Sequence, residues 1–85
     1  MKLLYFSWIK QQIGVAQEDV ILPDDIHNMK DLITWLIGRG PEYERALCDL
    51  TVVRFAINQE FAGLDAGVVN EDEIAIFPPI TGGKG

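Results

Sequence analysis

The C-terminal stretch Glu73–Gly85 reads EIAIFPPITGGKG, and it decides how the rest of the chain is interpreted. It begins with two isoleucines that alternate with Ala75 and Phe77. Because both sets of side chains are apolar, we predict a short strand that is buried on both faces. Pro78 and Pro79 end this strand, since proline has no N–H to give to a sheet and holds the chain extended.

After the prolines the chain has almost no bulk. Ile80 and Thr81 lead into Gly82 and Gly83. Glycine has no Cβ, so we expect residues 80–85 to form a thin, flexible tail. Such a tail, attached directly to a core strand, is suited to insertion into another protein. A frayed terminus has the same composition, and this segment alone does not separate the two interpretations.

Length and charge restrict the possible functions. The 85 residues suffice for one sheet and a helix or two, but not for an enzyme with its own deep cleft and lid. The net charge of −6 argues against nucleic acid or an anionic membrane as the main partner, because both require a basic face. The same charge permits attraction to a basic protein.

The residues that most often carry chemistry are few. The single cysteine, Cys48, excludes an intrachain disulfide and a paired-cysteine metal site, and we expect it to be a small buried side chain. The only histidine, His27, is expected in a loop. The acidic groups at 24–25 and 71–73 lack metal-loop spacing and indicate solvated turns or steering of a partner. No apolar run has the length of a signal peptide or membrane span, so we expect a cytoplasmic location.

Upstream of the closing segment the sequence predicts two helices and four further strands. The main helix, 29–37, has apolar residues at the spacing of one helical face and follows Asn28, a typical N-cap. A shorter helix follows Pro41 and runs from 42 to about 47. The strands share short apolar runs bounded by turns. They are expected at 2–9, 20–22, 52–57, briefly within 58–61, and at 74–77. Turns are expected at 10–14 and at the start of 58–61.

This order, β-β-α-α-β-β-β, predicts an α+β domain in which one mixed sheet of about five strands wraps on the main helix. A right-handed crossover places the closing strand beside the first strand and therefore in the centre of the sheet. We also expect an exposed apolar patch near the closing strand, because a small domain with this many aromatic residues does not hide them all. Which face of the first strand meets the core, and whether Trp35 covers the helix flank or a partner, stay open.

With these landmarks the whole chain resembles the β-grasp, or ubiquitin-like, fold, with the domain over residues 1–79 and the tail over 80–85. More narrowly, it is similar to the small subunits of molybdopterin synthase, the sulfur carriers of molybdenum cofactor biosynthesis. One part of the likeness is Ala56–Gln59, where the third strand enters an Asn-Gln turn. The other is 69–83, where an acidic turn, an apolar strand, Phe-Pro-Pro and Gly-Gly occur together.

The resemblance implies a carrier without a permanently bound cofactor or metal. A ubiquitin-activating-type enzyme would use ATP to adenylate the C-terminal carboxylate of Gly83, which is then converted to a thiocarboxylate. The tail would enter the large synthase subunit, whose own groups catalyse transfer of the sulfur to a cyclic pyranopterin and so build the molybdopterin dithiolene. The family suggests a heterotetramer with two carriers on a dimer of large subunits. Phe77, Pro78 and Pro79 would anchor and direct the tail, and Gly82 would leave space beside the reacting residue. Together with Ile80 and Thr81, they form the predicted tail and partner-docking site.

The sequence departs from this family after Gly83, because Lys84 and Gly85 follow and leave no carboxylate there to activate. Removal by a protease, a cloning remnant, activation of Gly85 itself and loss of carrier function are the open explanations. Carriers of this fold also serve thiamine synthesis, tRNA thiolation and cysteine synthesis, so another sulfur pathway is an alternative. From a different class, a non-catalytic β-grasp module that only docks to a partner is the second alternative.

Overall fold

Helix α2 (Met29–Ile37) forms where the apolar spacing predicts it in the computed structural model, which describes residues 1–79. The Asn28 side chain caps it by accepting a 2.8 Å hydrogen bond from the backbone N–H of Asp31. The other elements, in chain order, are β1 (Lys2–Tyr5), α1 (Ser7–Ile13), β2 (Gln17–Asp19), α3 (Pro41–Leu47), the 3₁₀ helix η1 (Leu50–Val52), β3 (Arg54–Ile57), β4 (Glu60–Ala62) and β5 (Glu73–Phe77). Both predicted helices are therefore confirmed.

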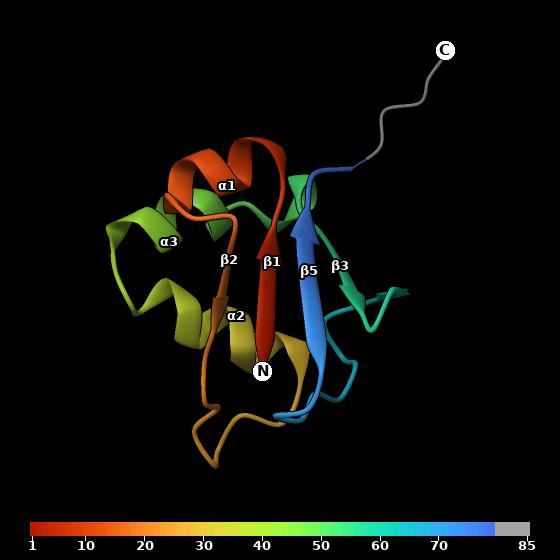
Figure 1. Cartoon of the computed structure of the whole chain (residues 1–85). Helices are drawn as coiled ribbons and strands as arrows, with labels where there is room; N and C mark the ends of the chain where they lie inside the picture. Colours follow the sequence, from red (N-terminus) through yellow and green to blue (C-terminus); the bar gives the residue numbers. More distant parts are fainter. Residues whose placement is uncertain (80–85) are drawn as a thin grey trace.

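The strands form one mixed sheet in the order β2-β1-β5-β3-β4 (Figure 1). The closing strand β5 lies in the centre, parallel to β1 and antiparallel to β3. This confirms that the first and last strands pair, although they lie at opposite ends of the sequence. A mixed five-stranded sheet wrapped on a main helix is the predicted β-grasp architecture.

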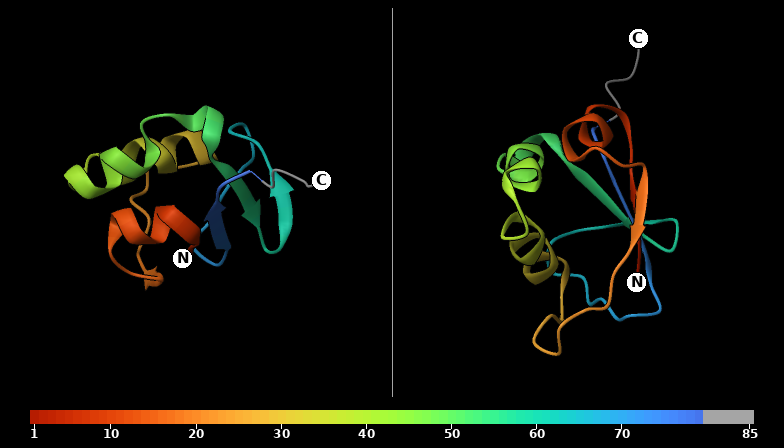
Figure 2. Two further views of the ribbon diagram at one scale, coloured as in Figure 1. Left: turned by 90° about the horizontal axis from the view of Figure 1, so that it is seen from above. Right: turned by 60° about the vertical axis from the view of Figure 1, so that its left-hand side comes forward.

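One face of the sheet meets the helices, and the side chains alternate accordingly. Leu3 and Tyr5 on β1, with Ile74 and Ile76 on β5, are at most 1% exposed. They form a core with the buried face of α2. Figure 2 shows α2 and α3 on the same side of the sheet. The core face of the first strand is thus the one that carries Leu3 and Tyr5, and Leu4 lies on the open face.

The predicted first strand over 2–9 is correct only within β1, and the predicted turn over 10–14 is wrong. The backbone turns sharply at Ser7, whose φ of 58° lies outside the strand region. The following residues form α1, in which Ile9 and Ile13 lie about one turn apart and are buried. The apolar alternation of the N-terminal residues concealed this helical spacing.

The second strand is also displaced from its predicted position at 20–22. The observed strand, β2, lies earlier and pairs antiparallel with β1. The backbone N–H of Leu22 instead donates to Oδ1 of Asn70 at 2.8 Å. Because β2 is a polar edge strand, with only Glu18 partly covered, hydropathy does not reveal it.

The third strand begins two residues later than predicted, at Arg54, because residues 50–52 form η1. The turn between β3 and β4 consists of Asn58 and Gln59, with φ values of 51° and 73°. Two consecutive positive φ values match the twist of a tight hairpin, and asparagine tolerates them better than most residues. The predicted brief fourth strand after this turn is confirmed as β4. Within residues 1–79, no helix has the length and apolarity that a membrane crossing requires.

Candidate functional site

The chain leaves the sheet at Phe77, the last residue of β5, and continues through Pro78 and Pro79. These three side chains are partly buried, so the point from which the tail departs is held against the domain. It lies at the end of the central strand, where β1 also finishes (Figure 1). The other predicted tail and sulfur-carrying residues lie outside the described residues; they are Ile80, Thr81, Gly82, Gly83, Lys84 and Gly85.

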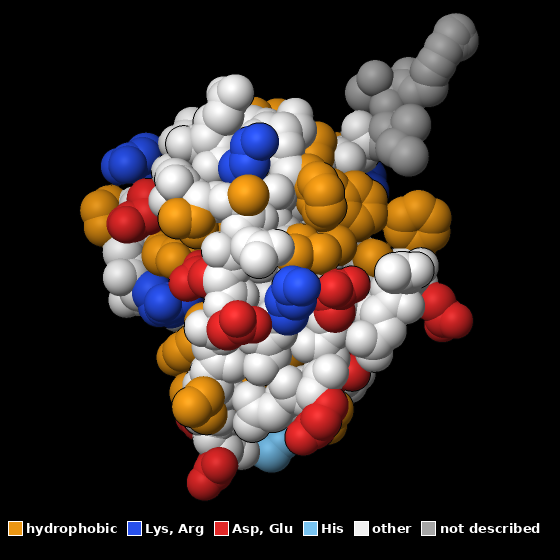
Figure 3. Space-filling view, in the orientation of Figure 1, with side chains coloured by type: hydrophobic (Ala, Val, Ile, Leu, Met, Phe, Trp, Pro, Cys, Tyr) orange, Lys and Arg blue, Asp and Glu red, His pale blue; other side chains and the backbone are white. Residues whose placement is uncertain are grey.

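Apolar side chains cover the open face of the sheet beside this point. The strand register brings Leu4, Ala75, Ala56 and Phe61 into one row across the sheet. The Phe61 ring is 79% exposed, and its centroid lies 5.9 Å from that of Phe77. Figure 3 shows hydrophobic side chains gathered on this face near the end of β5. Leu4, Ala75 and Phe77 are partly exposed, whereas Ala56 between the strands is only 7% exposed. These five residues, called the apolar patch below, confirm the prediction of an exposed apolar surface near the closing strand, chiefly through the Phe61 ring.

The start of β5 is fixed by Asn58 in the β3–β4 turn. The Asn58 Oδ1 accepts from the backbone N–H of Glu73 at 3.0 Å, and its Nδ2 donates to Asp72 Oδ1 at 2.9 Å. The other Asp72 oxygen accepts from the Val69 N–H at 2.9 Å. Part of the acidic turn at 71–73, predicted to be solvated or to steer a partner, therefore has a structural task. Sequence analysis missed this link, whose one visible signal was asparagine in a tight turn.

Known proteins resemble this chain both in sequence and in fold. The sequence matches the ThiS family over residues 3–83. The chain belongs to this family. It is 35% identical to the molybdopterin synthase sulfur carrier subunit of Haemophilus influenzae, over 98% of this chain and 99% of that protein. It is 33% identical to the subunit of the same name from Chlamydomonas reinhardtii, over 98% of each chain.

The fold of this ThiS-family chain also matches solved structures. The crystal structure of SAMP1 from Haloferax volcanii superposes with a TM-score of 0.75 at 27% identity, covering 98% of each chain. The predicted membership of the ubiquitin-like sulfur-carrier family, and the predicted β-grasp fold, are therefore confirmed.

A polar cluster lies at the opposite edge of the sheet, around Glu18 on β2. The Glu18 Oε2 accepts hydrogen bonds from the hydroxyls of Tyr5, at 2.6 Å, and Tyr43, at 2.7 Å. Its Oε1 pairs with Nη1 of Arg39 at 3.2 Å. The Arg39 guanidinium lies over the rings of Trp35, at 5.2 Å, and Tyr43, at 5.0 Å. Trp35 is partly buried and packs against the core, so it covers the flank of α2, one of the two roles that the sequence left open.

The pKa values around Glu18 follow from these contacts. Burial, together with the hydrogen bond to Glu18, raises the pKa of Tyr5 far above its usual range and that of Tyr43 to about 12. Burial opposes ionisation of Glu18, but the hydrogen bonds from both tyrosines and the charge of Arg39 together lower its pKa. At neutral pH the carboxylate is ionised and both phenols are protonated. This cluster stabilises the fold and has no free acid or base for catalysis.

Cys48 and His27 do not join a common site. The thiol of Cys48 is exposed, and the prediction that it is buried is wrong. α3 ends with the buried Leu47, so Cys48, one position further along, points away from the core, and its Sγ lies 3.8 Å from the Arg45 carbonyl oxygen. His27 lies in a loop, as predicted. Over residues 1–79, histidine, cysteine and acidic side chains nowhere form a group of three that suits a metal ion.

Proposed function

We propose that this chain is a sulfur carrier that supplies molybdopterin synthase through a thiocarboxylate on Gly83. The observation that carries the proposal is the similarity to carrier subunits over nearly the whole of each protein. The ThiS-family match extends to residue 83, so it spans the part of this chain that holds the apolar strand, Phe-Pro-Pro and Gly-Gly. The geometry of the described residues supports the proposal, because β5 ends beside an exposed apolar patch. A protein that binds this patch meets the chain where it leaves the sheet.

The chemistry explains why the tail is built from glycine. A carboxylate oxygen of Gly83 would attack the α-phosphorus of ATP, releasing pyrophosphate and leaving an acyl-adenylate. A sulfide-equivalent donor would then attack the acyl carbon, and AMP would leave as the thiocarboxylate forms. Both reactions require the acyl carbon to reach deep into another protein. Gly82 and Gly83 have no side chain to obstruct that approach.

The proposal assigns catalysis to partners. The Glu18 cluster is internally satisfied. Outside it, the Thr51 hydroxyl donates to Asp49 Oδ1 at 2.6 Å, but that oxygen also accepts from the Thr51 N–H in the turn that begins η1, so this pair caps the turn. We therefore place ATP in an adenylating enzyme of the ubiquitin-activating type, and the pyranopterin in the large synthase subunit. The carrier itself would hold no cofactor and no metal, would bind neither nucleic acid nor membrane, and would act in the cytoplasm. Two carriers on a dimer of large subunits is the assembly proposed.

A second candidate uses the same tail chemistry for another product. The chain matches the ThiS family as a whole, and its fold matches SAMP1, so similarity extends beyond molybdopterin synthase subunits. In this alternative, the Gly83 thiocarboxylate supplies sulfur to another pathway. The two candidates predict the same loading reaction and different acceptors.

The test is the intact mass of chains that end at different residues, after treatment with ATP, the activating enzyme of the same organism and a sulfur donor. A chain ending at Gly83 is expected to gain the mass of sulfur replacing one oxygen. A chain ending at Gly82 is the matched control, since it retains a glycine carboxylate one residue short. Failure of the Gly83 chain to gain sulfur overturns the carrier proposal.

Transfer separates the two candidates. The loaded chain is mixed with the large synthase subunit and the cyclic pyranopterin, and dithiolene formation is measured. Loss of sulfur with formation of the dithiolene supports the first candidate. Loading without transfer to this acceptor favours the second. Repeating the loading with residues 1–85 shows whether Lys84 and Gly85 must be removed first.

A further inference from the structure

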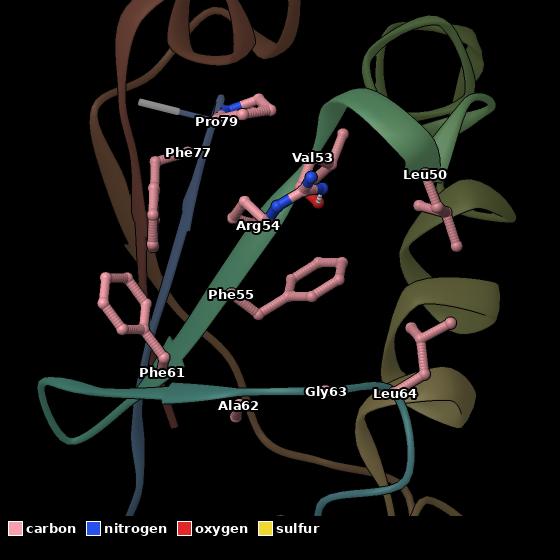
Figure 4. A pocket seen from close by; sticks show the side chains of 10 residues that line it. All are labelled: Leu50, Val53, Arg54, Phe55, Phe61, Ala62, Gly63, Leu64, Phe77 and Pro79. Atoms are coloured by element: carbon pink, nitrogen blue, oxygen red, sulfur yellow. Dashed lines mark hydrogen bonds between the residues drawn. The ribbon is translucent and has the colours of Figure 1, made fainter. Parts of the chain in front are cut away.

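A hollow of about 540 Å³ lies beside the point where the chain leaves the sheet. Its lining surrounds the beginning of β3. The rings of Phe77 and Phe61 lie on one side of the strand, and Leu50 and Leu64 lie on the other (Figure 4). Ten residues line it: Leu50, Val53, Arg54, Phe55, Phe61, Ala62, Gly63, Leu64, Phe77 and Pro79.

The walls of this hollow are almost entirely apolar. Phe55 is only 6% exposed and belongs to the core, whereas Phe61 is 79% exposed and forms the outer rim. Leu50 and Leu64 are partly buried and pack against the core. The volume lies in the range of sites that enclose a ligand group, so a bulky apolar side chain of another protein fits inside.

Arg54 is the one charged residue among those that line the hollow. It lies opposite Phe77 in the register of β3 and β5, so both side chains are on the open face of the sheet. Its Nη1 donates to the carbonyl oxygens of Thr51, at 3.2 Å, and Val53, at 2.9 Å. These bonds hold the guanidinium in place, and no carboxylate in residues 1–79 pairs with it. In a chain with a net charge of −6, this is a fixed cation beside an apolar hollow.

The bond from Arg54 to the Val53 carbonyl also limits what can bind. Beyond Phe55, which pairs with Ala62, β3 has no neighbouring strand on its β4 side. The Val53 N–H donates to the Leu50 carbonyl, and its carbonyl accepts from Arg54. With its N–H already engaged, Val53 has no donor left for an added strand, and the Arg54 guanidinium covers its carbonyl. The hollow is suited to side chains rather than to β-augmentation.

We propose that this hollow receives a segment of the large synthase subunit in which a bulky apolar side chain stands next to an aspartate or glutamate. The apolar side chain fills the hollow, and the carboxylate pairs with the free donors of Arg54, whose planar fork favours such a partner. Phe77 and Pro79 line the hollow, so a protein that takes up the chain beyond Pro79 lies next to it. The inference rests on the proposed function and adds the chemistry of the contact.

The test is the dissociation constant between the full chain and the large subunit of the same organism, measured by calorimetry at low and high salt. Arg54→Glu is expected to weaken binding about 10- to 100-fold, the range for losing a charge-assisted pair. Gly63→Trp is expected to weaken it by occupying the rim. A Cβ at Gly63 meets no heavy atom within 4 Å, so the side chain begins in open space. Arg45→Glu is the matched control, because it makes the same charge change at an exposed position on α3.

The proposal is supported if Arg54→Glu and Gly63→Trp raise the dissociation constant while Arg45→Glu leaves it close to that of the parent chain. The dissociation constant of Arg54→Glu should also depend less on salt than that of the parent. Thermal unfolding of each variant verifies the fold. If the parent binds and all three variants bind equally well, the inference is overturned while the proposed function stands. If Arg54→Glu impairs only sulfur loading by the activating enzyme, the choice of the large subunit is wrong. If the parent chain does not bind the large subunit at all, the first candidate function fails and supply of sulfur to another pathway is favoured.

Discussion

Two arginines at opposite edges of the sheet are used in different ways. Arg39 is engaged on several sides, by the Glu18 carboxylate and by the rings of Trp35 and Tyr43. Arg54 bonds to two backbone carbonyls and pairs with no carboxylate in residues 1–79. The first edge completes its contacts within the chain and stabilises the fold. The second leaves apolar surface and a cation exposed beside Phe77 and Pro79, as a docking site requires.

The largest expected effect is at the Glu18 edge. Tyr5→Ala should lower the free energy of unfolding by about 3–5 kcal/mol, because it removes a fully buried aromatic ring and leaves a cavity. Phe6→Ala is the neighbouring control, since Phe6 is 48% exposed and loses far less buried area. Both are measured by denaturant unfolding. Equal costs for the two variants would contradict the assignment of Tyr5 to the structural core beside Glu18.

Glu18→Ala should cost less, about 1–3 kcal/mol, because it leaves the buried Tyr5 hydroxyl without an acceptor. The double variant Glu18→Ala/Tyr5→Phe removes both partners and should recover part of the loss. Asp19→Ala, one residue along the same strand at an exposed position, serves as the control. A double variant no more stable than Glu18→Ala alone would show that the hydrogen bond contributes little.

Sequence reasoning located the elements whose pattern is strong. The spacing of Leu32, Ile33 and Leu36 predicted α2, and the apolar run before Pro78 predicted the central strand β5. These succeed because burial imposes a period that single residues rarely break. The place where the chain leaves the sheet was predictable for the same reason, since proline reliably ends a strand.

The errors occurred where long-range contacts override local pattern. β2 is polar and exists because β1 offers it a partner, while α1 was concealed by residues that alternate like a strand. The Glu18 edge was also missed, since it joins side chains from β1, β2 and two helices with no common spacing. The hollow beside Arg54 depends in the same way on side chains from separate elements.

A lower pH is expected to reduce the unfolding free energy by less than either substitution at the Glu18 cluster. Contacts with Tyr5, Tyr43 and Arg39 lower the Glu18 pKa in the folded chain below its unfolded value of 4.5. The unfolded chain therefore binds the proton more readily, so this carboxylate stabilises the fold above pH 4.5 and loses that contribution as the pH falls through the folded pKa. The comparison is unfolding free energy against pH for the parent and Glu18→Gln. The parent should lose more stability than the variant below pH 4.5, and parallel curves would contradict the assignment.

The smallest effect on stability is expected at Phe61, on the edge strand β4. A variant there tests whether binding and stability depend on different edges of the sheet. Phe61→Ser should change the unfolding free energy by no more than about 0.5 kcal/mol, because the ring is 79% exposed. It removes the ring that lies 5.9 Å from Phe77, so affinity for the large subunit should fall although the fold is intact. Unfolding and binding are measured on the same preparation. A variant that unfolds easily and binds normally would reverse the roles assigned to the two edges.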